Sequence, residues 1–288
     1  MANIRKTNKN HPWWSPWLRI SRFFIILYAG LVLVVAGCQR GLIYYPERAA
    51  EEAMRQRASA MGWEVWKDGE GQFSGWRHAD QKGRDHLVIF HGNAGHALMR
   101  EYWLSIFDQL GEDRFAGVSV LEYPGYGFRE GRPSEKAIFD GALRAIEPLI
   151  ESMESPDRLF LLGESLGSGV ATRVAKAFPD SIDGLLLVTP FTDLAAVGRF
   201  HFPYLPVRLL LRDRYDNVKQ LRDYRGPVVV VVAGQDGVVP ARFGRELYEG
   251  YQGPKRLKEL SEADHNTLLH FADDAFWQDT INFLRQDH

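Results

Sequence analysis

The sequence predicts an α/β fold with a mostly parallel central sheet and helices on both of its faces. Short apolar runs with the composition of buried strands alternate with longer stretches that carry an apolar stripe at helical spacing. Such alternation favours βαβ units, in which successive strands lie parallel in one sheet. Ligands bind at the carboxyl ends of the strands in such sheets. The functional site should therefore lie in the loops that follow the strands.

The expected elements follow one another at regular intervals. We expect strands at residues 62–67, 73–78, 86–90, 116–121, 159–162, 184–188, 227–233 and 256–260. We expect helices at residues 49–61, 102–110, 134–153, 170–178, 241–251 and 275–285.

Turn and capping residues separate these elements. Gly69, Gly71 and the Asp80–Asp85 cluster supply turns between the first strands. Ser134, three residues before Ala137, is placed to begin a helix. Residues 190–224 break the alternation with aromatic, proline and charged residues, so we expect a small cap inserted there over the sheet edge.

The composition excludes several classes of protein. With 288 residues, 45% of them hydrophobic and 25% charged, the chain can bury one sizeable core. A formal net charge of −2 gives no basic footprint for nucleic acid. The single cysteine, Cys38, excludes an intrachain disulfide and a cysteine-rich metal site. Neither a P-loop nor a paired-histidine zinc motif occurs, so we expect no nucleotide cofactor and no metal.

The first 38 residues form a separate segment, and we expect the catalytic domain at residues 39–288. The segment is basic, and residues 23–36 form an apolar run of 14 residues. This run is shorter than the roughly 20 residues that span a bilayer and has the length of a signal-peptide core. It ends in Val35-Ala36-Gly37-Cys38, which resembles the lipobox of bacterial lipoproteins, where the new N-terminal cysteine is lipidated.

Two alternatives to the lipoprotein remain open for this segment, namely an uncleaved membrane anchor and a buried helix. Under either membrane interpretation the positive charge before the apolar run predicts that the body lies outside the cytoplasm, on the periplasmic side of a bacterial envelope. Residues 40–46 are expected to be a short connector.

The motif at residues 163–169, G-E-S-L-G-S-G, follows an expected strand and precedes an expected helix. A serine on such a sharp turn has its Oγ exposed beyond the sheet, above the N–H groups of the helix N-terminus. Gly163 and Gly167 fit a close approach of strand and helix. A bare G-x-S-x-G is a weak signal, so the interpretation depends on its context.

Several motifs together make the chain from about residue 42 to 284 resemble the α/β-hydrolases, specifically the membrane-tethered serine hydrolases with an H-G-N-A-G loop. The matching segments are residues 91–95, 123–127, 163–169, 214–218, 234–240 and 264–266. Two departures occur: Phe128 and Arg129 replace a small polar continuation of the loop after Gly127, and Glu164 precedes the serine. The resemblance implies a hydrolase of esters, lipids or acylated proteins.

The resemblance implies a Ser165, Asp236 and His265 triad, because these residues follow expected strands in the order Ser, Asp, His. Ser165 needs a base because a hydroxyl is a poor nucleophile. Asp236 would orient the imidazole of His265, with Asp264 as its competitor. The backbone N–H groups of Leu166 and Asn93 are expected to form the oxyanion hole. His91 and His96 are expected to brace the loop that follows the expected strand at 86–90.

The substrate class is left open by the sequence. An ester, a thioester or an amide could pass through the same acyl-enzyme, and the partner is expected to be a small-molecule or lipid acyl substrate. Tyr123 and Phe191 are candidate pocket residues, and Phe191 opens an apolar cluster with Phe200, Phe202, Tyr204 and Leu205 that either binds an acyl chain or packs the cap. The alternatives are a serine peptidase of the prolyl-oligopeptidase kind and a non-catalytic, membrane-tethered binding protein.

Overall fold

The computed structural model describes residues 15–79, 84–109 and 115–286. The chain divides into two compact units, Met1–Gln39 and Arg40–His288. The basic residues before position 15 and most of the Asp80–Asp85 cluster lie outside the described residues.

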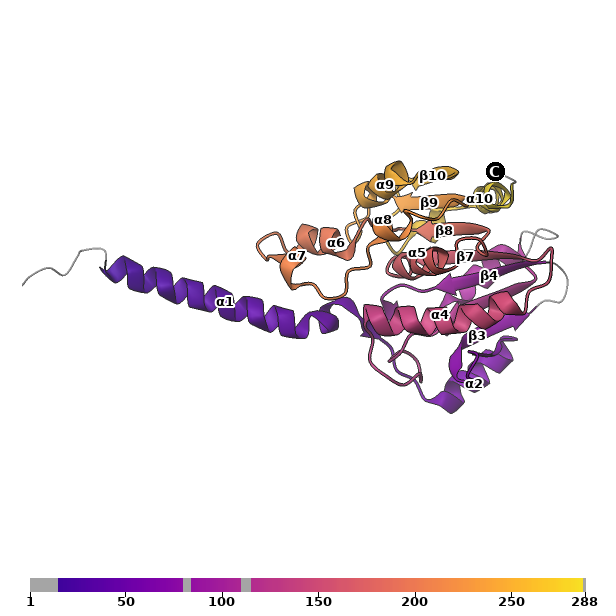
Figure 1. Ribbon diagram of the computed structural model, residues 1–288, viewed down its shortest axis with the longest axis horizontal. Helices are drawn as coiled ribbons and strands as arrows, with labels where there is room; N and C mark the ends of the chain where they lie inside the picture. Colours follow the sequence, from indigo (N-terminus) through magenta and orange to yellow (C-terminus); the bar gives the residue numbers. More distant parts are fainter. Residues whose placement is uncertain (1–14, 80–83, 110–114, 287–288) are drawn as a thin grey trace, which may run out of the picture. The chain divides into compact units, whose positions relative to one another are not determined.

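The first unit contains most of a long helix, α1 (Ser15–Ile43) (Figure 1). Within it, Trp17–Ile43 has a mean hydropathy of 2.2 and is long and apolar enough to cross a membrane, a test that a signal sequence also passes. The expected connector at 40–46 is wrong in part, because the helix continues to Ile43. The expectation that the apolar segment is too short to span is also wrong, since helical residues flank the apolar run on both sides. Cleavage before the exposed Cys38 stays a prediction.

The second unit is built on an eight-stranded sheet with the order β10-β9-β8-β7-β4-β6-β3-β2. The six strands from β10 to β6 are parallel, and β3 and β2 add an antiparallel edge. The predicted α/β class with a mostly parallel sheet is therefore confirmed. The strands are β2 (Glu64–Lys67), β3 (Phe73–Ala79), β4 (Asp85–Phe90), β6 (Gly117–Leu121), β7 (Arg158–Glu164), β8 (Gly184–Val188), β9 (Val228–Ala233) and β10 (Lys255–Leu260).

Helices cover both faces of this sheet, which explains why its strands are apolar without alternation. In β4, Val88 and Phe90 pack into one core together with α4, α5 and α9, whereas Leu87 and Ile89 pack into a second core with α2, α3 and α10 (Figure 1). The helices are α2 (Glu51–Ala60), α3 (Glu101–Asp108), α4 (Glu135–Glu151), α5 (Gly167–Ala177), α9 (Ala241–Gly250) and α10 (Asp274–Arg285).

Most expected elements match the structure to within two residues. Ser134 caps α4 as predicted, since its hydroxyl accepts a 3.1 Å hydrogen bond from the N–H of Ala137. Helix α5 begins three residues earlier than expected, at Gly167, because packing against the sheet overrides the low helix propensity of glycine there.

The structure adds elements that we did not expect. A short parallel pair joins β1 (Tyr45–Pro46) to β5 (Ala94–Gly95), and one helical turn, η1 (Ala97–Arg100), precedes α3. The predicted cap segment contains three short helices, α6 (Leu194–His201), α7 (Val207–Leu210) and α8 (Asn217–Gln220). A further turn, η3 (Leu268–Phe271), precedes α10.

Candidate active site

Ser165 lies on the sharp turn between β7 and α5. Its φ of +52° is in the left-handed region, and its N–H donates to the carbonyl of Val188 on the neighbouring strand. The flanking glycines allow the close approach that this turn needs. A Cβ on Gly167 would lie 1.9 Å from the carbonyl oxygen of Phe90, and one on Gly163 would lie 2.6 Å from the Cα of Ser168. The sequence thus forces Oγ outward at the carboxyl end of the sheet.

The structure brings Ser165, His265 and Asp236 together in one line of contacts. Oγ of Ser165 lies 3.1 Å from Nε2 of His265, and Nδ1 of His265 lies 2.7 Å from Oδ2 of Asp236. Because a carboxylate only accepts hydrogen bonds, Nδ1 carries the proton and Nε2 is left to accept from the serine hydroxyl. This is the arrangement that a general base requires.

Asp236 is fixed by the turn that follows β9. Its other oxygen, Oδ1, accepts the N–H groups of Val238 and Val239 at 2.8 and 2.6 Å, and its side chain is fully buried. The competitor Asp264 is exposed and accepts the N–H groups of Asn266 and Thr267 instead. These backbone bonds hold the pKa of Asp264 below its ordinary value. Asp264 is therefore occupied in its own turn.

The two expected oxyanion donors lie on either side of the serine. In the described part of the chain, the N–H groups of Asn93 and Leu166 donate to no other protein group. The side chain of Asn93 turns away to the carbonyl of Ile43, and its carbonyl accepts from Tyr45 N–H and from the hydroxyl of Tyr126. Asn93 is thus held by two hydrogen bonds to its carbonyl and one from its side chain, while its N–H stays available.

A cavity of about 490 Å³ opens beside the serine. Its walls come from the loop after β4, from α3 and from η3, so that Ser165 and His265 stand next to apolar side chains. The apolar lining is Trp103, Ile106, Val188, Leu268 and Leu269.

The prediction that Tyr123 and Phe191 line the substrate pocket is wrong. Both are fully buried in the core, and neither lines this cavity. The hydroxyl of Tyr123 donates to the carbonyl of His91, and Phe191 packs under the cap. Phe200 and Phe202 are exposed on the surface of the cap. The apolar cluster expected at 191–205 is therefore not one wall, because Phe191 packs inward whereas Phe200, Phe202 and Tyr204 are exposed.

A charged pair forms the polar end of the cavity. Nε of Arg100 lies 3.4 Å from Oε2 of Glu164, which also accepts from the hydroxyl of Tyr102 at 2.5 Å and from Trp103 Nε1 at 3.2 Å. Burial and this carboxylate raise the pKa of Tyr102, so its hydroxyl stays a donor. Nη2 of Arg100 reaches the carbonyl of Ala94. Glu164, which departs from the family pattern, thus connects the serine turn to the oxyanion loop.

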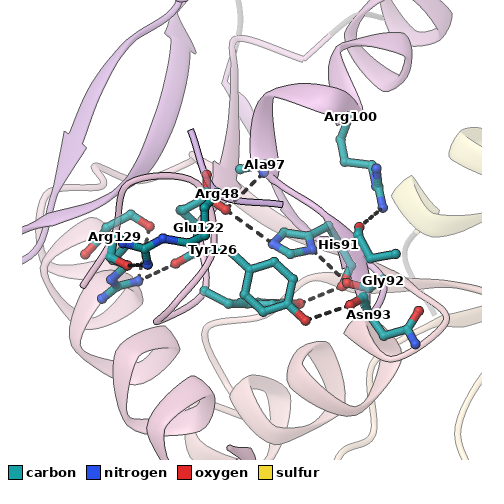
Figure 2. Close-up of polar contacts among 12 residues, drawn as sticks. Arg48, His91, Gly92, Asn93, Ala97, Arg100, Glu122, Tyr126 and Arg129 are labelled. Carbon is teal, nitrogen blue, oxygen red and sulfur yellow. Dashed lines mark hydrogen bonds and ion pairs between the residues drawn. The ribbon is translucent and has the colours of Figure 1, made fainter. Parts of the chain in front are cut away.

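Behind the loop lies a buried polar cluster around His91 and Glu122 (Figure 2). Burial lowers the pKa of His91 well below 6.5 and raises that of Glu122 to about 8, so both side chains are uncharged at neutral pH. The predicted bracing role of His91 agrees with this geometry.

Two groups at the site had no distinct signal in the sequence. Asn217 is fully buried and donates to Ser168 Oγ and to the carbonyl of Phe191, which joins the cap to the turn that carries Ser165. Glu122 comes one residue before the matching segment 123–127 and had no role assigned from the sequence. Among the described residues no group of three or more His, Cys, Asp or Glu is arranged to hold a metal ion.

Comparison with known proteins gives a consistent picture. A family model described as alpha/beta hydrolase fold matches residues 85–209. An uncharacterized protein of Mycobacterium tuberculosis is 32% identical over 245 residues, which cover 84% of this chain and 85% of that protein. The lysophosphatidylserine lipase ABHD12 of Danio rerio is 27% identical over 202 residues, covering 64% of this chain and 52% of that protein.

Solved structures show the same fold. An esterase of Pyrococcus furiosus matches 84% of this chain and 97% of its own, with a TM-score of 0.62 at 16% sequence identity.

Proposed function

The chain belongs to the α/β-hydrolase family, and on that premise we propose that it is a serine hydrolase that cleaves acyl esters or thioesters through an acyl-enzyme on Ser165. The observation that carries the proposal is the unbroken line of contacts from Ser165 Oγ through His265 to the buried Asp236, at the wall of a cavity. A neutral imidazole in this tautomer can accept the serine proton as Oγ attacks a carbonyl carbon.

The reaction would proceed in two balanced steps. In the first, Oγ of Ser165 bonds to the acyl carbon, the bond to the leaving oxygen or sulfur breaks, and His265 passes the serine proton to that leaving group. In the second, His265 takes a proton from water, the resulting hydroxide equivalent attacks the acyl carbon, and Ser165 regains its proton as the acid leaves. Asp236 stabilises the imidazolium that exists in both steps.

The free N–H groups of Asn93 and Leu166 support an oxyanion hole in each step. Negative charge develops on the carbonyl oxygen when the carbon becomes tetrahedral, and fixed donors in a site with little water stabilise that charge. Both N–H groups belong to segments that contact the serine turn, and both lack another acceptor among the described residues.

The cavity supports an acyl substrate. Ile106, Leu268 and Leu269 line the same cavity as Ser165, and apolar side chains suit a hydrocarbon chain. The similarity to ABHD12 of Danio rerio, a lysophosphatidylserine lipase, also supports a lipid-derived ester as substrate. The helix Trp17–Ile43 supports a membrane location, with the second unit outside the cytoplasm.

Activity-based labelling tests the proposal directly. A fluorophosphonate probe should label the membrane-extracted full-length protein, and a panel of p-nitrophenyl esters, acyl thioesters and peptides should rank the esters or thioesters first. Ser165→Ala serves as the blank. Absence of labelling in the native protein would favour a binding protein without turnover, and faster peptide cleavage would favour a peptidase.

A further inference from the structure

Glu122 and His91 each follow the last residue of a strand, and these two strands are neighbours in the sheet. The parallel register pairs Phe90 of β4 with Leu121 of β6, so the next residue of each strand enters the same buried space at the carboxyl end of the sheet. Both side chains are fully buried, and Oε1 of Glu122 lies 3.7 Å from Nε2 of His91. Figure 2 shows Glu122 between this imidazole and the N–H of Ala97, which donates to Oε1 at 3.1 Å.

The other side of the imidazole is attached to the oxyanion loop. Nδ1 of His91 lies 2.7 Å from the carbonyl oxygen of Gly92, and because a carbonyl only accepts, Nδ1 carries a proton. In the neutral ring Nε2 therefore presents a lone pair toward Glu122. Nε2 of His91 and Oε2 of Glu122 are both buried, and neither has a hydrogen-bond partner in the described part of the chain.

A proton on the Glu122 carboxyl would avoid placing two acceptors face to face. The 3.7 Å separation is longer than a hydrogen bond, but a carboxylic acid facing an imidazole lone pair is still a donor facing an acceptor, whereas a carboxylate there would place two acceptors together in a fully buried space. Burial raises the pKa of Glu122 to about 8, against the lowering effects of the Ala97 N–H and of Arg129, Arg100 and Arg48. The neutral pair therefore persists through neutral pH.

The three arginines near the Glu122 carboxyl donate their hydrogen bonds to backbone carbonyls. Arg129 donates to the carbonyls of Glu122 and Ser74, and burial lowers its pKa to about 10. Arg48 donates to the carbonyl of Arg129, and Arg100 to that of Ala94. Burial holds the pKa of His96 below its ordinary value. The rings of Tyr123 and Tyr126 pack on His91, and burial raises the pKa of both tyrosines, so both hydroxyls keep their protons. None of these groups bonds the Glu122 carboxyl in place of His91.

We propose that Glu122 and His91 share one buried proton and that this proton positions the H-G-N-A-G loop for the chemistry at Ser165. The inference rests on the proposed function and adds to it a pair of positioning residues. The imidazole holds the carbonyl of Gly92, and the peptide that follows this carbonyl carries the N–H of Asn93. The hydroxyls of Tyr123 and Tyr126 hold the carbonyls of His91 and Asn93 at 2.8 and 2.6 Å.

Loss of the shared proton should therefore move one oxyanion donor. A carboxylate on Glu122 repels the lone pair of His91, the ring shifts, and the Gly92–Asn93 peptide shifts with it. Because the large apolar side chains that line the cavity come from α3, β8 and η3 and not from this loop, the loss should appear mainly in kcat and leave KM nearly unchanged. Removal of an oxyanion donor typically lowers the rate by about 10²–10³-fold.

The test is the alkaline side of the pH profile. Rates of fluorophosphonate labelling and of p-nitrophenyl butyrate hydrolysis are measured from pH 6 to 9.5 on full-length protein, with the Ser165→Ala rate subtracted. If the ionised pair is inactive, the native rate should fall about 30-fold between pH 7 and 9.5, since pH 9.5 is 1.5 units above the Glu122 pKa of about 8. In Glu122→Gln, whose amide is uncharged and cannot ionise in this pH range, the alkaline fall should disappear.

Two comparisons make the result decisive. Glu147→Gln, on the exposed side of α4, should keep the alkaline fall of the native protein. Difference infrared spectra between pH 7 and 9.5 should show the loss of one protonated-carboxyl band that is missing in Glu122→Gln. A flat native profile, or an equal alkaline fall in Glu122→Gln, overturns the proposal even if labelling of Ser165 is normal. A native protein that is never labelled instead rejects the proposed function.

If Glu122→Gln fails to fold, the native protein alone still decides. An alkaline fall in kcat accompanied by loss of a protonated-carboxyl band supports the shared proton, and an alkaline fall without that band contradicts it.

Discussion

Oγ of Ser165 lies 3.1 Å from Nε2 of His265, although the two residues are 100 positions apart in the chain. Two different loops at the carboxyl end of one sheet create this contact. β7 ends at the serine turn, and the loop after β10 carries the histidine, with β8 and β9 between the two strands. Asp236, after β9, reaches the imidazole from the intervening strand. Each side chain is thus placed by the end of its own strand.

Replacement of the serine should remove covalent reactivity and leave the fold unchanged. Ser165→Ala deletes a single hydroxyl at a position whose main chain is fixed by its own N–H bond to Val188. We expect no fluorophosphonate labelling and an unchanged thermal midpoint. Ser59→Ala, on the exposed face of α2, is the matched control and should label normally. Labelling that persists in Ser165→Ala would move the nucleophile elsewhere.

Substitution of Asp236 and substitution of Asp264 should have very different effects on kcat. Asp236→Asn keeps the shape of the side chain but offers an amide to Nδ1, which favours the wrong tautomer of His265. We expect kcat to fall on the order of 10³–10⁴-fold. Asp264→Asn alters only an exposed turn and should change kcat by less than about threefold. The measurement is ester hydrolysis at saturating substrate. If Asp264→Asn lowers kcat more than Asp236→Asn does, Asp264 and not Asp236 is the carboxylate of the triad.

The buried acid should make stability depend on pH. The pKa of Glu122 is about 8 in the folded protein, above its ordinary value of 4.5. Between these values the folded chain holds a proton that the unfolded chain has released, so the free energy of unfolding falls as pH rises through this window. The slope is at most ~1.4 kcal/mol per pH unit. Glu122→Gln should lack this component.

The thermal midpoints of both proteins at pH 5.5 and 8.5 measure that difference. The native protein should lose stability relative to Glu122→Gln as pH rises, while Glu147→Gln should follow the native curve. Parallel curves for native protein and Glu122→Gln would mean that Glu122 ionises at the same pH in both states.

The sequence predicted what depends on local pattern. Strands buried on both faces have a continuous apolar signal, and the glycines around Ser165 report a turn that only they can form. The order of Ser165, Asp236 and His265 was enough to select one histidine among nine, and the structure brings these three residues together.

What could not be predicted depends on which strands are neighbours and on how helices pack. Glu122 meets His91 only because β4 and β6 are adjacent in register. Likewise the cavity wall comes from α3 and η3, whose approach to Ser165 leaves no pattern in the sequence. Aromatic composition pointed instead to the cap, where Phe191 is buried in the core and Phe202 faces outward.

The N-terminal processing of the chain can be decided by mass. If Cys38 is the lipidated N-terminus, intact mass spectrometry of membrane-extracted protein should show loss of residues 1–37 and an acyl modification, and Cys38→Ala should block both changes. The exposed thiol on α1 is accessible to such chemistry. A full-length, unmodified chain would decide for an uncleaved anchor, to which the 27-residue span Trp17–Ile43 is also suited.

The acyl-chain preference should be set by Ile106 and not by the cap. Ile106 lines the cavity, whereas Phe202 is exposed on the cap surface. Each methylene that enters the cavity contributes at most about 0.8 kcal/mol, which is roughly a fourfold gain in kcat/KM. In the native protein kcat/KM should therefore rise with chain length until the cavity is full.

A bulkier side chain at position 106 should end that rise earlier. With Ile106→Trp we expect the optimum to move to p-nitrophenyl esters at least two methylenes shorter, with a loss of about 15-fold for the chain that the native protein prefers. Short esters, which do not reach the new ring, should be cleaved at the native rate. Phe202→Ala is the matched control and should leave the optimum unchanged. If Phe202→Ala shifts the chain-length optimum and Ile106→Trp does not, the acyl chain lies under the cap.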